Sequence, residues 1–384
     1  MPTYAADSWI SNLLKHYNMK KLLISLLAVV SLPVAIQAQE YVATFDTQKQ
    51  YDAQYQEAKM KYAFESYKGS HKSWHKKFYN ELENLLGLTE LKERYKNFVP
   101  KAELLSTEDI GFATRERWQI WTEPTMIIPM VITRPKNCSG KMPICITPQG
   151  HNKNPEAYSG VISSPADSIA VATKDADVAL RAAKSGFIAI NPTTRGFGKT
   201  RHPDAIRKDR PHSCQYYMQR GVLTGRNIIG DRVWDVMKII DWALTNLPVD
   251  TSRIVVTGNS GGGTVTLYAG AMDRRITLCA PSSCFCSFEA SIGTIHHCPC
   301  NHIPYIMDLC NMGDIAGLVA PRKLLIINGD KDNIFPIGPA REEFKTTKAV
   351  YEAFGVAENC EMYVGDGPHR YFWAGFSDYY KRHF

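Results

Sequence analysis

The sequence predicts an α/β fold: a doubly wound, mostly parallel sheet with helices on both faces and a helical extension at its N-terminus. Three observations predict this class. Short β-branched runs alternate with helical stretches from about residue 110 onward. One such run leads through a glycine-flanked serine into a helical segment, and residues 48–98 show helical spacing before the first run begins. Sheets of this kind bind ligands at the carboxyl ends of their strands.

The first 38 residues have the pattern of a bacterial secretory signal. Met19-Lys20-Lys21 precedes an apolar stretch from Leu22 to Leu32, and Ala38 is the expected last residue before cleavage. We expect translation to start at Met19, which makes residues 1–38 a leader. The apolar run is shorter than the ~20 residues of a membrane span and is followed by Pro33, which disfavours the alternative of a membrane anchor. The sequence therefore predicts a periplasmic or secreted protein without stable membrane insertion after cleavage.

Residues 39–105 form the predicted helical extension, and residues 106–384 form the predicted catalytic domain. In the extension, Trp74, Phe78, Leu82 and Leu85 follow each other at spacings of four, four and three. This spacing places them on one face of a helix, where an aromatic stripe is typical of a buried core. We expect one or two helices here, docked on the main domain.

The catalytic domain alternates between strand and helix patterns. The expected strands are Trp118–Trp121, Met126–Thr133, Met142–Thr147, Phe187–Ile190, Ile254–Thr257, Ile276–Ala280, Lys323–Asn328 and Glu361–Val364. Asp177–Lys184 is rich in alanine and is followed by Gly186, and Asp231–Leu247 carries an apolar stripe that stops at Pro248. Both are expected helices between strands.

Ser260 is the predicted nucleophile. It lies in Gly258-Asn259-Ser260-Gly261-Gly262, between a strand and a helix, which is the pattern of a nucleophile elbow. Glycines at 258 and 262 allow the strand and the helix to pack closely at a strained turn. A glycine-rich loop in this place could instead hold a phosphate, but the sequence here has neither a terminal Gly-Lys-Ser/Thr nor the spaced glycines and later acid of a dinucleotide site.

A serine nucleophile needs a base and an acid that orients the base. In this chain order the acid follows the serine and the histidine comes last. Asp332 is the predicted acid, because Gly329, Asp332 and Pro336 reproduce the usual acid loop, and Asp330 is expected to hydrogen-bond its own turn. His369 is the predicted base, because it follows the last expected strand through a glycine-rich loop.

Two main-chain N–H groups are expected to stabilise the oxyanion. Gly261 supplies one, and the loop after Met142–Thr147 supplies the other, from His151 or Asn152. We expect the His151 side chain to pack in this loop or to contact substrate. Asn152 and Arg195 are further candidates for substrate binding.

With these residues in place, the chain resembles an α/β-hydrolase of the acetyl xylan esterase type, related to dienelactone hydrolase and prolyl oligopeptidase-like folds. The resemblance spans residues 110–384. The motifs that carry it are Gly150-His151, Arg195-Gly196-Phe197-Gly198, the approach 249–254 to Gly258–Gly262, the segment 318–322, the Gly329/Asp332/Pro336 loop and Gly367-Pro368-His369. It implies a triad of Ser260, Asp332 and His369, no cofactor, and hydrolysis of small acyl esters on carbohydrates. The chain departs from the family pattern at Gln149, where many relatives have histidine, and in its Cys/His-rich stretch 284–302.

Cysteine and charge leave two further questions. Ten cysteines in an exported chain favour disulfides. Cys298-Pro299-Cys300 stands among three histidines, but C-x-C spacing matches structural zinc poorly, so we expect no metal.

The net charge of +7 becomes +5 after loss of the three lysines and one aspartate of residues 1–38. This mild excess, without basic residues interleaved with aromatic ones, does not predict a nucleic-acid partner. Basic residues between Arg195 and Arg210 either attract an anionic substrate or form a solvated loop.

The predicted function is an exported serine esterase that deacetylates a plant-type polysaccharide or oligosaccharide. A methyl or other esterase for uronic-acid glycans is the alternative, because of the basic segment after Arg195. A serine peptidase is a further alternative, although the N-terminal helical extension is too small for a propeller. A non-catalytic binding module is the last, although it would have no reason to keep the serine, the acid and the histidine in order. Nothing in the sequence indicates an oligomeric state.

Overall fold

A computed structural model describes residues 45–136 and 139–384 of the chain. The predicted signal segment lies outside these residues. Residues 48–384 form one compact unit. Within the described part of the chain, every helix is too short or too polar to cross a bilayer.

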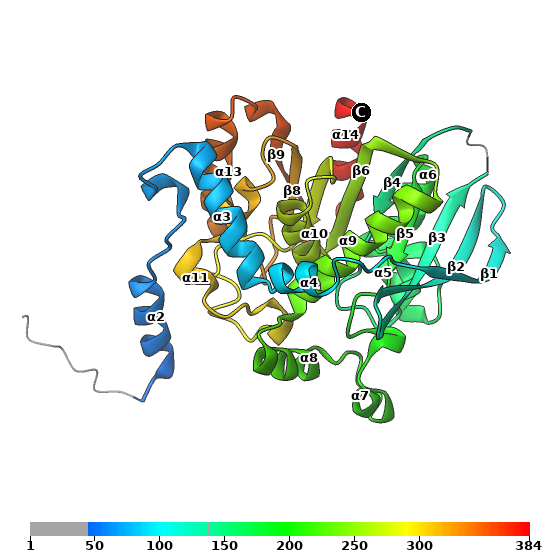
Figure 1. The fold of residues 1–384 in the computed structure, drawn as a ribbon, viewed down its shortest axis with the longest axis horizontal. Coiled ribbons are helices and arrows are strands. Elements are labelled where there is room, and N and C mark those ends of the chain that lie inside the picture. The colour runs from blue at the N-terminus through cyan, green and yellow to red at the C-terminus, as the bar shows by residue number, and fades with distance from the viewer. Residues whose placement is uncertain (1–44, 137–138) are drawn as a thin grey trace, which may run out of the picture. The chain divides into compact units, whose positions relative to one another are not determined.

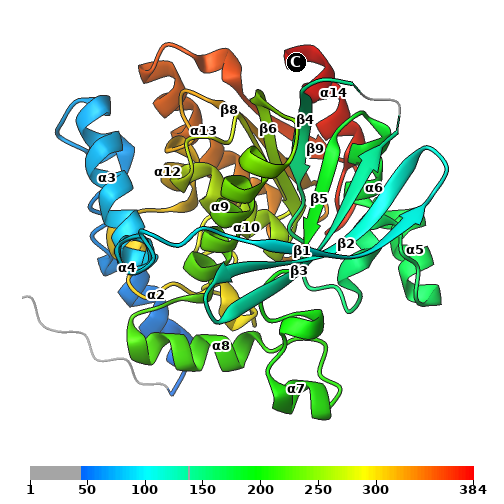
Figure 2. The ribbon, with the colours of Figure 1, turned by 45° about the vertical axis from the view of Figure 1, so that its right-hand side comes forward.

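A nine-stranded mixed sheet runs through the described part of this unit (Figure 1). Its strands are β1 Ala102–Asp109, β2 Ala113–Glu123, β3 Met126–Pro135, β4 Met142–Ile146, β5 Ile188–Pro192, β6 Val249–Asn259, β7 Leu278–Ser282, β8 Lys323–Gly329 and β9 Cys360–Gly365. The order is β1-β2-β3-β5-β4-β6-β7-β8-β9. The pairs from β5 to β9 are parallel, and β1, β2 and β3 form an antiparallel ribbon at one edge (Figure 2). The predicted α/β class with a mostly parallel sheet is confirmed.

Helices surround this sheet. The α-helices are α2 Thr47–Glu57, α3 His71–Leu85, α4 Leu88–Arg94, α5 Pro165–Lys174, α6 Val178–Lys184, α7 Pro203–Arg207, α8 Cys214–Gly221, α9 Ile228–Asn246, α10 Gly261–Met272, α11 Ile306–Leu309, α12 Met312–Gly317, α13 Ile337–Ala353 and α14 Trp373–His383. Short 3₁₀ turns lie between them, including η2 Pro155–Ser159, η3 Gly198–Thr200 and η5 Pro299–Asn301. The stripe Trp74, Phe78 and Leu82 is buried on α3, as the spacing predicts.

Both faces of the parallel strands are buried, in two separate cores. Along β6, Ile254 and Val256 belong to one core and Val255 belongs to the other, because side chains alternate across a strand. Helices α3, α9, α10, α12 and α13 contribute to the first core, and α6 and α14 contribute to the second. Burial on both sides explains why these strands read as continuous apolar runs in the sequence.

The antiparallel ribbon differs from the sequence-based expectation in one strand. No strand is expected before Trp118, yet β1 pairs with β2 from Ala102 to Asp109. Seven of its eight residues are exposed, so no apolar alternation reveals it. It is an edge strand whose existence depends on pairing with β2.

Candidate active site

Ser260 lies between the end of β6 and the start of α10. Its backbone is at φ 58° and ψ −124°, a conformation that L-residues rarely adopt. Its N–H donates to the carbonyl of Ser282 at the end of β7, 2.8 Å away. The side chain is partly exposed, whereas the neighbouring strand and helix are buried. The sequence therefore produces a strained, accessible serine at the carboxyl edge of the sheet.

The glycines around Ser260 are required by close backbone contacts. A methyl group on Gly262 would lie 2.0 Å from the carbonyl oxygen of Pro148, and one on Gly258 would lie 2.4 Å from the same oxygen. The sequence suggested packing of strand against helix as the reason for these glycines. In the structure the loop after β4 is the closest neighbour of both, so they also hold that loop beside the serine.

His369 and Asp332 are brought together at the ends of β9 and β8. His369 Nδ1 lies 2.8 Å from Asp332 Oδ2, and the other carboxylate oxygen accepts from the N–H groups of Ile334 (2.8 Å) and Phe335 (3.0 Å). The Asp332 side chain is fully buried, while that of His369 is 21% exposed. With all of these donors on one buried carboxylate, the His369 ring is held in one orientation.

Asp330 has a different place. Its Oδ1 accepts from the N–H of Gly367, 2.8 Å away, and it is exposed at the surface. We expected it to bond its own turn. It instead bonds the loop that carries His369, so it shapes the approach to the histidine rather than contacting the imidazole.

Two contacts link the serine turn to the histidine loop through the end of β7. Ser260 N–H donates to Ser282, and the next residue, Ser283, donates its hydroxyl to the carbonyl of Arg370 at 2.8 Å. Phe335 packs its ring against His369, with centroids 6.0 Å apart and an interplanar angle of 21°. Sequence reasoning missed Ser283 and Phe335 as positioning residues, because neither stands in a recognisable motif.

The loop after β4 runs along the serine. A methyl group on Gly150 would lie 3.3 Å from Ser260 Cβ, and one on Gly261 would lie 3.1 Å from His151 Nδ1. The Asn152 N–H donates back to the Gly150 carbonyl at 2.8 Å, whereas the His151 N–H has no hydrogen bond to any described residue. Of the two expected donors in this loop, the His151 N–H is therefore the one available for an oxyanion.

Arg195 lies in a buried ion-pair network. It is 3% exposed, and its guanidinium contacts Asp235 at 2.6 Å and Glu123 at 2.8 Å. Arg226 also pairs with Glu123 at 2.8 Å. Burial alone would raise the pKa of the Glu123 carboxyl, but Arg226 and Arg195 outweigh it and lower that pKa to about 2. These carboxylates pair with the Arg195 guanidinium, which also lines a cavity, and the Arg195 carbonyl accepts from Arg232 at 2.9 Å.

His297 is a second histidine that packs against Phe335, and its ring is uncharged. Burial lowers the pKa of His297 to about 4, so the ring is neutral at neutral pH. Its Nδ1 accepts from Asn301 Nδ2 at 2.9 Å, and its ring packs edge-on against Phe335. Phe335 thus lies between two histidines, of which only His369 contacts a carboxylate.

Part of the chain matches a known protein family. Residues 125–297 match the acetyl xylan esterase family model, a span that includes His151 and Ser260 but ends before Asp332 and His369. YtaP of Bacillus subtilis (strain 168), described provisionally as a hydrolase, is 26% identical over 140 residues, which are 36% of this chain and 47% of that protein. The chain thus matches about half the length of this curated relative.

Solved structures share the fold. A protein of Bacteroides fragilis NCTC 9343, described provisionally as an acetyl xylan esterase, superposes with a TM-score of 0.69 at 17% identity, over 85% of this chain and 84% of that one. Methylesterase BT1017 gives 0.62 at 18% identity, over 86% and 68%. A glucuronoyl esterase from Solibacter usitatus gives 0.54 at 14% identity, over 73% and 84%. From the family match over residues 125–297, the sheet and the strained serine turn together, the chain has an α/β-hydrolase fold of the acetyl xylan esterase type.

Proposed function

We propose that this chain is an exported serine esterase that removes acetyl groups from a plant-type polysaccharide or oligosaccharide. The observation that carries the proposal is the 2.8 Å bond between His369 and the buried Asp332, on the loops after β9 and β8, at the same sheet edge as Ser260. Parallel strands place their carboxyl ends at one edge, which puts the loops that carry Asp332 and His369 on the same side of the sheet as Ser260. The match to the acetyl xylan esterase family supports the acetyl group.

In the proposed reaction, Ser260 Oγ attacks the ester carbonyl carbon while His369 Nε2 takes the hydroxyl proton. Asp332 keeps the other ring proton on Nδ1 and stabilises the imidazolium. The N–H groups of Gly261 and His151 bind the oxyanion. His369 then returns the proton to the departing sugar hydroxyl, which leaves an acetyl group on Ser260. Water, activated by the same histidine, releases acetate and restores the serine.

The test compares Ser260→Ala with Ser252→Ala. Both serines lie on or next to β6, but Ser252 is exposed near the start of the strand. We expect Ser260→Ala to lower acetate release from acetylated xylan by at least ~10³-fold and Ser252→Ala to leave it unchanged. A fluorophosphonate probe should label the wild type and the Ser252 variant at Ser260. Failure to label the wild type would favour the binding module over any serine hydrolase.

Esterolysis of methylated uronic acids is the second candidate. The ion-pair network of Arg195, Arg226, Glu123 and Asp231 lines one side of a cavity of about 500 Å³. Arg201 and Arg220 line the same cavity outside that network, and these cations suit a carboxylate-bearing sugar. Methanol release from methylated pectin without acetate release from xylan would favour this reading. Export is tested separately: after expression in a bacterial host with residues 19–38 intact, the protein in the periplasm should begin at Gln39.

A further inference from the structure

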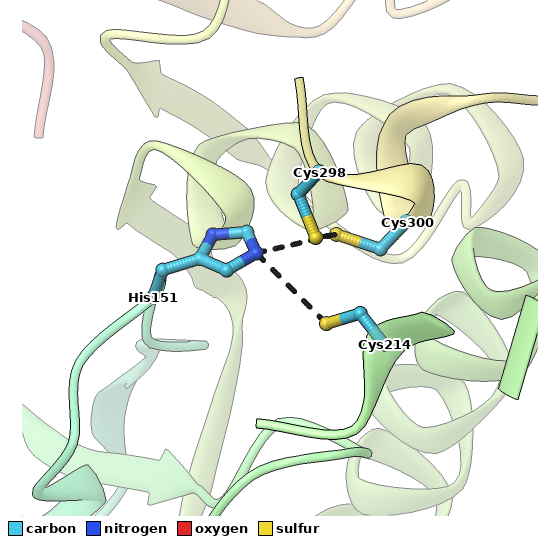
Figure 3. Close-up of side chains that lie close together, drawn as sticks. All are labelled: His151, Cys214, Cys298 and Cys300. Carbon is cyan, nitrogen blue, oxygen red and sulfur yellow. Dashed lines mark hydrogen bonds between the residues drawn. The ribbon is translucent and has the colours of Figure 1, made fainter. Parts of the chain in front are cut away.

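Four side chains that can bind a metal come together from three chain segments (Figure 3). His151 comes from the loop after β4, Cys214 from the start of α8, and Cys298 and Cys300 from the segment at η5. Their ligand atoms all lie within 4.8 Å of one another. Cys214 and Cys300 are buried, and the nine described cysteines form no disulfides.

The separations fit a tetrahedral metal site. Cys300 Sγ lies 3.4 Å from His151 Nε2 and 3.2 Å from Cys298 Sγ. Cys214 Sγ lies 3.9 Å from His151 Nε2. Zinc binds sulfur at about 2.3 Å and nitrogen at about 2.0–2.1 Å, so neighbouring ligand atoms in a tetrahedron are about 3.6–3.8 Å apart. The measured separations lie on both sides of these values. A disulfide would need its sulfurs at about 2.05 Å.

A buried cation supplies an independent observation. Arg232 is 2% exposed and has no carboxylate within 4.0 Å among the residues that the structure describes. The Arg195 carbonyl accepts from its Nε and Nη2, which fixes the guanidinium, and Nη2 also lies 3.4 Å from Cys214 Sγ. An unpaired buried cation is costly. Three thiolates and one Zn²⁺ carry a net charge of −1, which Arg232 would balance.

We propose that His151 Nε2 and the thiolates of Cys214, Cys298 and Cys300 bind one Zn²⁺. Three protons leave the thiols on binding, and the imidazole remains neutral. Four protein ligands close the coordination sphere, which is typical of a structural rather than a catalytic zinc. The sequence-based expectation of no metal depended on the C-x-C spacing alone, and Cys214 supplies a ligand that this spacing does not include.

The zinc would fix the loop that runs along Ser260. Its ligand His151 is the residue whose main-chain N–H makes no hydrogen bond to a described residue, and the far side of the His151 ring faces Gly261. The metal would therefore hold the oxyanion loop against α8 and the η5 segment without touching substrate. Metal binding itself is measured without substrate, so this inference stands or falls separately from the proposed esterase activity.

The test measures metal content in the tag-free protein after reduction, addition of equimolar zinc sulfate and desalting. We expect about one zinc per wild-type chain by mass spectrometry, and X-ray absorption should show three sulfur ligands and one nitrogen ligand. Cys214→Ser and Cys300→Ser should lose at least ~10-fold in zinc affinity. Cys360→Ser is the matched control, because Cys360 is equally buried at the start of β9, far from the cluster in sequence.

Two results would overturn the proposal. One is that the wild-type protein contains no zinc after this loading. This holds both when its intact mass shows that two hydrogens were lost to a disulfide and when all of its thiols remain free. The other is zinc binding that Cys214→Ser and Cys360→Ser alter equally. Because the absorption spectrum is recorded on the wild type, the answer does not depend on whether a cysteine variant folds.

Discussion

Replacing Asp332 with asparagine tests the triad without removing a side chain. The amide oxygen of the new side chain can still accept from the N–H groups of Ile334 and Phe335, as Asp332 Oδ1 does at 2.8 and 3.0 Å. The amide nitrogen then faces His369 Nδ1, where the carboxylate oxygen stood at 2.8 Å. Since an amide nitrogen donates, His369 must present a lone pair at Nδ1 and carry its proton on Nε2. In that tautomer it cannot accept a proton from Ser260.

The size of the effect follows from this tautomer change. Amide replacement of the triad acid lowers kcat by about 10⁴-fold in a serine protease, which is the worked example for this geometry. A 10⁴-fold loss corresponds to about 5.4 kcal/mol of transition-state stabilisation, at about 1.36 kcal/mol per tenfold change. We expect a similar loss here, because Asp332 is fully buried and bonds the imidazole directly. KM should change little, since the carboxylate does not reach substrate.

The assay is steady-state hydrolysis of an aryl acetate, with Asp330→Asn as the matched control. An amide oxygen at position 330 can still accept from Gly367, so this variant should keep kcat within about tenfold of the wild type. Thermal unfolding of both variants shows whether the fold is intact. If Asp332→Asn retained more than a tenth of the wild-type kcat, or if both variants lost the same amount, His369 would not depend on Asp332 and the assignment would be wrong.

Two further predictions concern stability and packing. Burial, with repulsion from Asp314 and Glu289, raises the pKa of Glu343 to about 8 from an unfolded value of 4.5, so folding favours its protonated form and stability falls as the pH rises through this window. In urea unfolding, the free energy of unfolding of Glu343→Gln should match that of the wild type near pH 4.5 and exceed it by about 1–2 kcal/mol at pH 8. The full pKa shift would correspond to ~4.8 kcal/mol, but part of the side chain reaches solvent, which reduces the effect. Equal unfolding free energies of the two proteins at both pH values would contradict this. Gly262→Ala would place a methyl group 2.0 Å from the Pro148 carbonyl and should cost about 1–3 kcal/mol and at least ~100-fold in turnover, whereas Gly338→Ala, with open space around it, should do neither.

The sheet was predictable where burial on both faces left an apolar signal in the sequence. The strand around Ile254–Val256 and its serine turn could be located because two cores take alternate side chains of β6. The β1 strand could not, because its residues face solvent and only its pairing with β2 holds it. The stripe on α3 could be predicted for the same reason as β6, because its apolar side chains are buried.

The surroundings of the site were less predictable, because they depend on residues distant in sequence. Arg195 stands in a basic segment and looks like a substrate contact, but the structure surrounds it with Glu123 and Asp235, 72 and 40 residues away. Cys214 carried no signal at all, since its partners His151 and Cys300 lie 63 and 86 positions away. No local spacing encodes such a set, and only the cysteine-rich segment 284–302 hinted that thiols would matter.

The strained turn at Ser260 explains why so many distant contacts converge here. A residue at positive φ costs roughly 1–3 kcal/mol and persists only where its surroundings determine it. From β7, the Ser282 carbonyl binds the Ser260 N–H, and from the loop after β4, the Pro148 carbonyl packs against Gly258 and Gly262. That loop has little regular structure of its own, and Gln149 ties it to Thr194 through a 2.9 Å bond. A metal at His151 would add a second anchor at the other end of the same loop. The strained backbone of Ser260 would then be maintained by two anchors on the loop after β4, the Gln149–Thr194 bond and the metal. Loss of either anchor should make the oxyanion site less ordered before the sheet unfolds.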